Sequence, residues 1–223
     1  MLHPARDLVD VYLSIKDTVI ERGFAWEIDW LTESDFNRVS ESDFLRESAW
    51  VVLTTGFRES VVRSVFGSLS SAFLDWRSAA VIQANSAQCR RAALRVFRNE
   101  RKIDAMLAIS SVVALDGFER VRFLINERTI DYLQTLPYIG SVTAFHLAKN
   151  LGLPVAKPDR HLTRIAHAAG FGSPQDLCEC ISERVGDPVH VVDLVLWRYA
   201  TLVSGYLASF SPRQSHRLAR SRG

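Results

Sequence analysis

Apolar residues recur at helical spacing through most of this chain, and this pattern most restricts the folds that it can adopt. The stretch from Ile103 to Leu115 is apolar nearly all round and predicts a buried central helix, ended by Asp116 and Gly117. Alternating apolar and polar residues bounded by hairpin turns, which mark strands, do not occur. One helix face near the N-terminus carries Leu8, Val11, Tyr12, Ile15, Val19 and Ile20.

The same periodicity predicts the other helices. Residues Ser40 to Asp43 form a typical helix start and precede the apolar run Trp50–Leu53. Further helices are expected at Arg58–Phe66, Ala87–Phe97, 118–126, 129–136, 141–151, 160–169, 174–185 and 189–207. We therefore expect an all-α protein of about ten helices. Residues 1–210 would form one domain, and residues 211–223 a mobile basic tail.

Length and cysteine content narrow the class of protein. The 223 residues suffice for one sizeable core or for two small lobes that share one. No apolar run approaches the roughly 18 residues of a membrane span, and acids near the N-terminus argue against a secretory signal. Cys89, Cys178 and Cys180 give no disulfide framework and too few ligands for an iron–sulfur cluster. A soluble, monomeric, cytoplasmic protein is expected.

Charge is distributed unevenly along the chain. Residues 1–47 hold eleven acidic and five basic side chains, so the remainder is strongly basic although the net charge is only +2. Only four of the 27 basic residues are Lys, and Arg suits bidentate contacts with phosphate. Composition alone fits a solvated helix face and a phosphate-binding surface equally well. The basic residues gather at Arg90, Arg91, Arg95, Arg98, Arg101 and Lys102, and in the tail at Arg213, His216, Arg217, Arg220 and Arg222.

Residues 136–140, Leu-Pro-Tyr-Ile-Gly, separate two helical segments. Pro137 fixes φ in the turn, and Gly140 allows a ligand to approach the backbone. A turn that opens a helix directs N–H groups outward, and the helix dipole adds to the attraction for phosphate. Such a hairpin would bind the DNA backbone without reading its sequence. Taken alone, the pattern fits an ordinary helical hairpin more readily.

A second element follows, because Asp159 lies nineteen residues after Gly140 and begins the pattern Asp159-x-His161-x-x-Arg164. Together the two elements resemble the helix-hairpin-helix (endonuclease III-like) superfamily of base-excision DNA glycosylases. That superfamily has an L-P-G-V-G hairpin and a catalytic Asp in a D-x-H-x-x-R frame. The resemblance covers residues 131–170. Weaker likeness occurs at Val52–Gly56, Asn85–Arg90 and Val191–Trp197.

The resemblance implies a two-lobed helical DNA glycosylase fold. The hairpin motif would occupy residues 129–151, and the catalytic loop and helix residues 153–170. Many members carry a nucleophilic Lys two residues after the hairpin Gly, where this chain has Val142. This implies a monofunctional enzyme that leaves an abasic site and needs neither a cofactor nor an iron–sulfur cluster. A lyase that uses Lys149 or Lys157, and a DNA-binding hairpin protein without catalysis, are the alternatives.

Asp159 is the residue to which the resemblance assigns catalysis. Breaking an N-glycosidic bond builds positive charge on the sugar, and a carboxylate beside C1′ stabilises that state and guides water. Asp159 also follows Pro158 and is predicted to cap the helix 160–169, a purely structural role that the local sequence alone favours. His161 is expected to support this loop, and Arg164 to pair with an acid or a phosphate.

The other site residues follow from their positions in the family pattern, since the base must leave the stack before its bond is attacked. The wedge is predicted at Phe57, Arg58 and Gln83. The base pocket is predicted at Trp26, Glu27, Trp30 and Tyr138. Backbone contacts are predicted at Leu136, Tyr138, Gly140, Val142 and Arg164. The carbonyls of Gln134, Leu136 and Ile139 are candidates for a sodium, potassium or magnesium site. The tryptophans and Phe57 also fit a core role.

The expected partner is double-stranded DNA that contains a modified or damaged base, which places the protein at the nucleoid. Two roles remain open at this point. One is base-excision repair, and the other is phage defence by removal of a hypermodified base such as glucosylated hydroxymethylcytosine.

Overall fold

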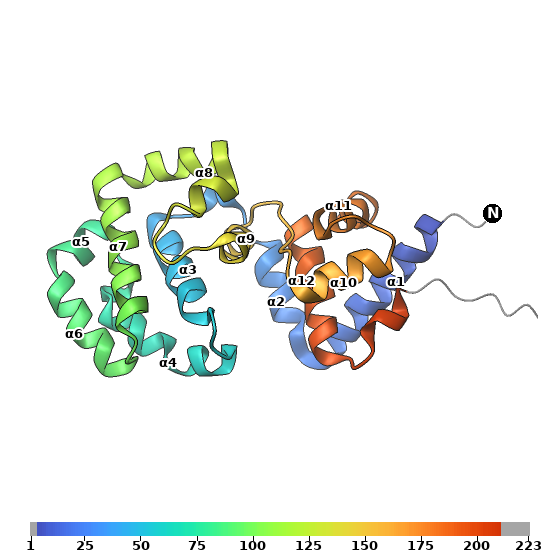
Figure 1. The fold of residues 1–223 in the computed structure, drawn as a ribbon, viewed down its shortest axis with the longest axis horizontal. Helices are drawn as coiled ribbons and strands as arrows, with labels where there is room; N and C mark the ends of the chain where they lie inside the picture. Colours follow the sequence, from blue (N-terminus) through green and yellow to red (C-terminus); the bar gives the residue numbers. More distant parts are fainter. Residues whose placement is uncertain (1–3, 211–223) are drawn as a thin grey trace, which may run out of the picture. The chain divides into compact units, whose positions relative to one another are not determined.

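The computed structural model describes the backbone of residues 4–210 and the side chains of residues 8–210. The predicted tail at 211–223 therefore lies outside the described residues. Every regular element in the described range is helical (Figure 1), which confirms the predicted all-α class for this part of the chain. The helices are α1 (Pro4–Val19), α2 (Ala25–Thr32), α3 (Glu41–Thr54), α4 (Glu59–Ala72), α5 (Ala79–Ala84), α6 (Ser86–Val96), α7 (Glu100–Asp116), α8 (Phe118–Leu133), α9 (Ser141–Asn150), α10 (Arg160–Ala168), α11 (Pro174–Val185) and α12 (Val189–Leu202). Among the described residues, no helix is long and apolar enough to cross a membrane.

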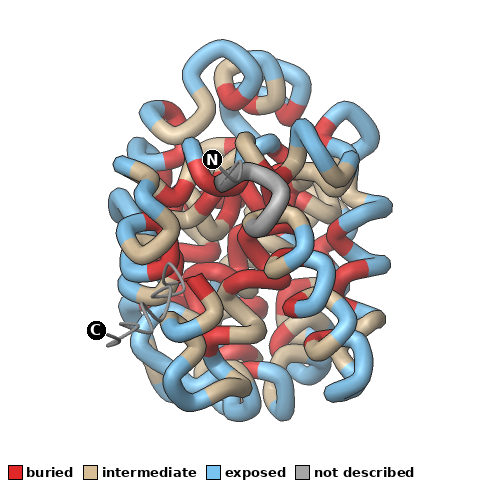
Figure 2. The backbone as a smooth tube through the Cα atoms, turned by 90° about the vertical axis from the view of Figure 1, so that its right-hand side faces the viewer, coloured by how far each residue is buried: buried red, intermediate tan, exposed pale blue. Residues whose placement is uncertain are grey.

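The described chain divides into two compact units. Unit 1 contains the residues up to Asp29 and those from Pro158 onward, and unit 2 contains Trp30–Lys157. In unit 1, α12 packs against α1, α10 and α11. In unit 2, α7 packs against α3, α5, α6 and α8, and α9 packs against α3 and α8. The buried stretches lie on the inner sides of the helices, and the exposed stretches face outward (Figure 2).

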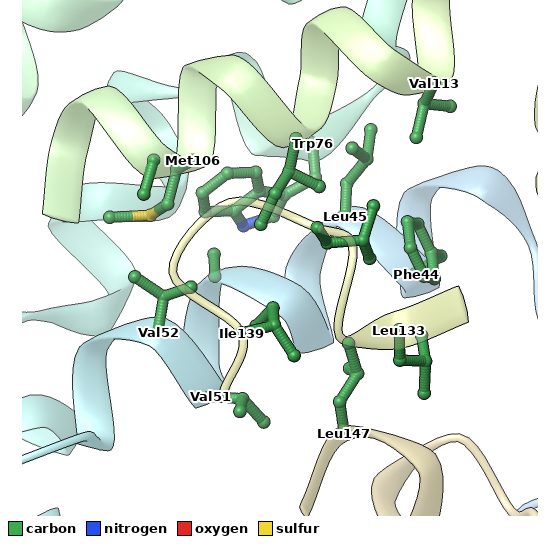
Figure 3. Packing of buried hydrophobic residues seen from close by; sticks show 14 of the residues in the cluster. Phe44, Leu45, Val51, Val52, Trp76, Met106, Val113, Leu133, Ile139 and Leu147 are labelled. Atoms are coloured by element: carbon green, nitrogen blue, oxygen red, sulfur yellow. The ribbon is translucent and has the colours of Figure 1, made fainter. Parts of the chain in front are cut away.

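The core of unit 2 anchors the 136–140 hairpin. Figure 3 shows Ile139 of the hairpin and Leu147 of α9 in the same cluster as Val51 and Leu133. Ile139 and Leu136 are both buried, and each such side chain contributes roughly 1.5–3 kcal/mol by leaving water. The hairpin is therefore fixed from its inner side.

Local signals set several helix boundaries as expected. At the start of α3, Ser40 Oγ accepts from the Asp43 N–H and Asp43 Oδ2 accepts from the Ser40 N–H, both at 3.1 Å. This reciprocal pair is a capping box and confirms the predicted start. Residues 118–126 and 129–136 were expected as two helices, and α8 consists of two helical segments that meet at a non-helical residue, Thr129 (φ 28°, ψ −99°). The second segment ends at Leu133, three residues before the predicted end.

Some predicted helix ends were wrong, because local backbone turns override the apolar periodicity. Helix α12 stops at Leu202 rather than continuing to 207, since the backbone becomes extended at Val203 (φ −114°, ψ 115°). Gly205 (φ 76°) then begins a short helical turn, Tyr206–Ser209. Leu115 at the end of α7 is 82% exposed, so the apolar pattern there extends beyond the core. Helices α2 and α5 were not predicted.

Candidate functional site

Asp159 lies at the N-terminus of α10 in unit 1 and is half-buried. Its Oδ1 accepts the backbone N–H of His161 at 2.8 Å and that of Leu162 at 2.9 Å, so the predicted N-cap is confirmed. Among the described residues, Oδ2 receives no hydrogen bond or ion pair. One oxygen therefore fixes the direction of the carboxylate, and the other is left for a ligand at the positive end of the helix.

The ring of His161 is held from both sides. Arg160 Nε donates to His161 Nε2 at 3.2 Å, and Nδ1 lies 3.1 Å from the hydroxyl of Tyr206. Because the guanidinium can only donate, a neutral His161 carries its proton on Nδ1 and donates it to Tyr206. These contacts connect His161 to Arg160 and to the turn after α12, and its expected role in supporting the Asp159 loop stays a prediction. Tyr206 was not predicted, since its contact depends on the turn after α12.

The hairpin between α8 and α9 divides the predicted backbone-binding residues into two groups. Leu136 is buried, and its carbonyl accepts the N–H of Ile139 at 3.1 Å, which closes the turn. Tyr138, Gly140 and Val142 are exposed. Only the exposed group presents its side chains or Cα to a ligand, while Leu136 acts as an anchor.

Gly140 is not required by the fold. Its φ of −87° and ψ of −178° are ordinary for any residue, and a Cβ built there meets nothing within 4 Å. Helix α9 begins immediately after it, at Ser141, without a side-chain cap. The N–H groups of this first turn are therefore directed toward an open surface, where an anion can bind them.

The predicted wedge residues differ in how free their side chains are. Phe57 and Arg58 lie in the exposed loop between α3 and α4, and the Arg58 side chain has no partner among the described residues. Gln83 instead donates its amide to the carbonyl of Leu107 at 2.8 Å. A wedge role for Gln83 stays a prediction, and it would require the loss of this hydrogen bond.

The predicted base-pocket residues belong to different units, since Trp26 and Glu27 lie in unit 1 and Trp30 and Tyr138 in unit 2. Glu27 is buried, and both of its oxygens accept from Arg198, at 2.5 and 2.8 Å. If Glu27 were to read a base edge, it would leave this guanidinium without its carboxylate. The ion pair with Arg198 gives Glu27 a structural role that does not involve a base.

Unit 2 contains a cavity of about 560 Å³ lined by Trp30, Glu47 and Asn150 among others. Asn150 donates to Glu47 at 3.2 Å, and burial raises the pKa of the Glu47 carboxyl above its ordinary value. Ser34 also lines this cavity, and its backbone lies so close to Gly152 (φ +83°) that a Cβ at this glycine would be 2.6 Å from the Ser34 carbonyl oxygen.

The two lysines proposed for a lyase lie near His146. Lys149 is only 6% exposed, and Lys157 is half-buried. Burial lowers the pKa of His146 well below its ordinary value, and the charges of Lys157 and Lys149 lower it further. The burial of Lys149 argues against its use as a nucleophile.

A third lysine, Lys102, was grouped with the surface arginines but is buried. Burial lowers its pKa to about 8. A signal for this was present, because Lys102, Met106 and Ile109 share one face of α7, and that face is buried.

The remaining cations are mostly exposed. Arg90 pairs with Asp104 and Glu100, at 2.6 and 2.9 Å. The exposed side chains without a partner among the described residues include those of Arg91, Arg95, Arg98, Arg101 and Arg164. Within the described range, no group of three or more His, Cys, Asp or Glu side chains is arranged to hold a metal ion. The cation expected at the carbonyls of Gln134, Leu136 and Ile139 stays a prediction.

Comparisons of the chain with protein-family models, with curated proteins and with solved structures gave no match.

Proposed function

We propose that this chain is a monofunctional DNA glycosylase that hydrolyses the N-glycosidic bond of a modified or damaged base at Asp159. The observation that carries the proposal is the Asp159 carboxylate, which has one oxygen fixed by two backbone N–H groups and one oxygen without a described partner. A fixed negative group of this kind stabilises positive charge as it develops on the sugar.

In the proposed reaction the bond between C1′ and the base nitrogen breaks, and its electron pair leaves with the base. The water oxygen forms a new bond to C1′, guided by Asp159. The proton released by water passes through the carboxylate to the departing base. The products are a free base and an abasic site.

The hairpin supports the DNA-binding part of the proposal. Gly140 precedes an uncapped helix start, although the fold would accept a side chain there. Close approach of a phosphodiester to the α9 N–H groups gives a reason for glycine at this position. A substitution of Gly140 by Val should weaken binding to DNA of every sequence without changing the unfolding free energy by much.

Three lysine-related features favour hydrolysis over a lyase reaction. Val142 stands where the resembled family has its nucleophile. Lys149 is buried, and Lys157 is partly so. Borohydride reduction in the presence of abasic DNA traps a covalent adduct only when an amine attacks the sugar. We expect no adduct, and a trapped adduct would replace the monofunctional mechanism with the lyase alternative.

The direct test is release of a free base from DNA by the purified chain. Release that depends on Asp159 supports the glycosylase. Tight DNA binding without release from any modified DNA would support the non-catalytic binding protein instead. Base-excision repair and phage defence both fit the proposed chemistry, and the identity of the released base separates them.

A further inference from the structure

Lys102 is a buried lysine whose ammonium lies at the end of another helix of unit 2. The residue is 1% exposed. Its Nζ donates to the carbonyls of Val52, Leu53 (3.1 Å) and Thr55 (2.6 Å), which end α3. An ammonium has three N–H donors, so all of them are used here. The negative end of the α3 dipole also favours a cation.

Two aromatic rings from separate loops lie against the same ammonium. The Nζ atom is 5.1 Å from the ring centroid of Phe57 and 5.1 Å from that of Tyr138. Phe57 follows α3, and Tyr138 is in the hairpin. Phe57 and Tyr138 are nevertheless 41% and 43% exposed. We call this pair, Phe57 and Tyr138, the aromatic platform.

Phe57 has a further ring contact, and Tyr138 has an unusual backbone conformation. Phe57 packs edge-on against Phe97, with ring centroids 5.1 Å apart. Tyr138 has a φ of 69°, a left-handed conformation that is unusual for a residue with a side chain. Such strain concentrates at functional sites. Capping of α3 by Lys102 explains the carbonyl contacts, but it does not explain two half-exposed rings on one cation.

We propose that Lys102 is a positioning residue that holds the aromatic platform in place, and that the platform stacks against unstacked bases of a distorted DNA duplex. The inference rests on the proposed glycosylase function, in which extrusion of a base leaves a gap in the stack.

The surroundings of the platform favour nucleic acid as its occupant. Arg58, next to Phe57, is exposed and has no side-chain partner among the described residues. Gly140, two residues after Tyr138, precedes the uncapped start of α9. Guanidinium and helix N–H groups suit phosphates, whereas aromatic rings suit bases.

The test uses a short duplex with 2-aminopurine beside a tetrahydrofuran abasic-site analogue, and an intact duplex of the same sequence. Affinity and 2-aminopurine fluorescence are measured for the wild type, Phe57→Leu, Tyr138→Leu and Lys102→Met. The matched control is Phe123→Leu, because Phe123 is also an exposed ring under a cation, Arg120, at 5.3 Å. Thermal melts show which variants are folded.

We expect each platform substitution to weaken binding to the gapped duplex by roughly tenfold, with a smaller effect on the intact duplex. Lys102→Met should likewise lose the preference for the gapped duplex over the intact one. It should also lose the change in 2-aminopurine fluorescence on binding. Adding Phe57→Leu to Lys102→Met should then change little. The control variant should behave as the wild type.

A folded Lys102→Met variant that keeps the wild-type preference for the gapped duplex would overturn the proposal. If Lys102→Met does not fold, Phe57→Leu and Tyr138→Leu provide the test. Binding of the gapped duplex with wild-type affinity by both of these variants would also overturn the proposal. Base release by the same proteins separates the two proposals. If the wild type releases a base and the ring substitutions do not change DNA binding, only the platform proposal is wrong. If the ring substitutions weaken binding to the gapped duplex but no DNA loses a base, the glycosylase proposal is wrong and the platform proposal stands.

Discussion

Substitutions of Asp159 by Asn and by Ala separate its structural role from its proposed catalytic role. Asparagine keeps an oxygen that can accept the N–H groups of His161 and Leu162, whereas alanine removes both hydrogen bonds. Loss of an N-cap costs about 1 kcal/mol, within a range of roughly 0.5–2. Loss of the charge alone costs about 0.3–1 kcal/mol near a helix N-terminus.

The expected results follow from these magnitudes. Asp159→Ala should lower the melting temperature by roughly 2–4 °C for each kcal/mol in a chain of this size, and Asp159→Asn by less. Both should reduce base release by at least about a hundredfold, since the charge that stabilises the transition state is gone. Urea unfolding followed by circular dichroism gives the stabilities, and single-turnover base release gives the rates.

A matched control exists in the same unit. Ser173 caps α11 and accepts the N–H of Asp176 at 3.1 Å, so Ser173→Ala should cost a similar amount of stability and leave base release intact. Wild-type release by Asp159→Asn would refute the catalytic role. An equal loss of stability in Asp159→Asn and Asp159→Ala would refute the capping geometry.

Three further predictions concern the supporting structure. Glu27→Gln should destabilise the protein by about 1–3 kcal/mol in urea unfolding, because it removes the charged partner of the Arg198 side chain, which is only 12% exposed; a change in DNA affinity alone would instead favour the base-pocket role. Gly152→Ala should cost at least about 1–2 kcal/mol for its left-handed backbone, and its Cβ would lie 2.6 Å from the Ser34 carbonyl oxygen; an unchanged melting temperature would contradict that packing. Burial raises the pKa of Glu47 in the folded protein. The stability that the protonated Glu47 contributes is therefore fully present below the pKa of this residue in the unfolded chain, and it is lost as pH rises through the pKa in the folded protein. Glu47→Gln cannot lose a proton, so its unfolding free energy should rise relative to the wild type as pH increases above the ordinary pKa of a glutamate, and a constant difference would argue against the shift.

Features with a local cause were predictable from the sequence. The capping box at Ser40 and the N-cap at Asp159 each depend on a few consecutive residues, and the structure has both. The end of α12 was missed because the backbone becomes extended at Val203, a residue that itself continues the apolar pattern. The spacing of apolar residues indicates which face of a helix is buried, but it does not indicate where the backbone leaves the helical conformation.

Contacts between distant residues were not predictable in the same way. Glu27 and Arg198 form an ion pair although they are 171 residues apart in the sequence. Lys102 donates to carbonyls that precede it by about fifty residues. The partner in each case is set by helix packing, which single-sequence periodicity does not specify. Lys102 was therefore grouped with its basic neighbours, although its place on the buried face of α7 was visible in the spacing.

The measurement that tests the central claim most directly is mass spectrometry of bases released from DNA by the purified full chain. The substrates are duplexes that each carry one damaged or modified base, together with hypermodified phage DNA. Asp159→Asn serves as the paired control, and DNA binding is measured on the same samples. We predict that the wild type releases at least one free base and leaves an abasic site, while the variant binds the same DNA without release. Equal release by both proteins, or DNA binding by the wild type without release from any substrate, would contradict the assignment of catalysis to Asp159.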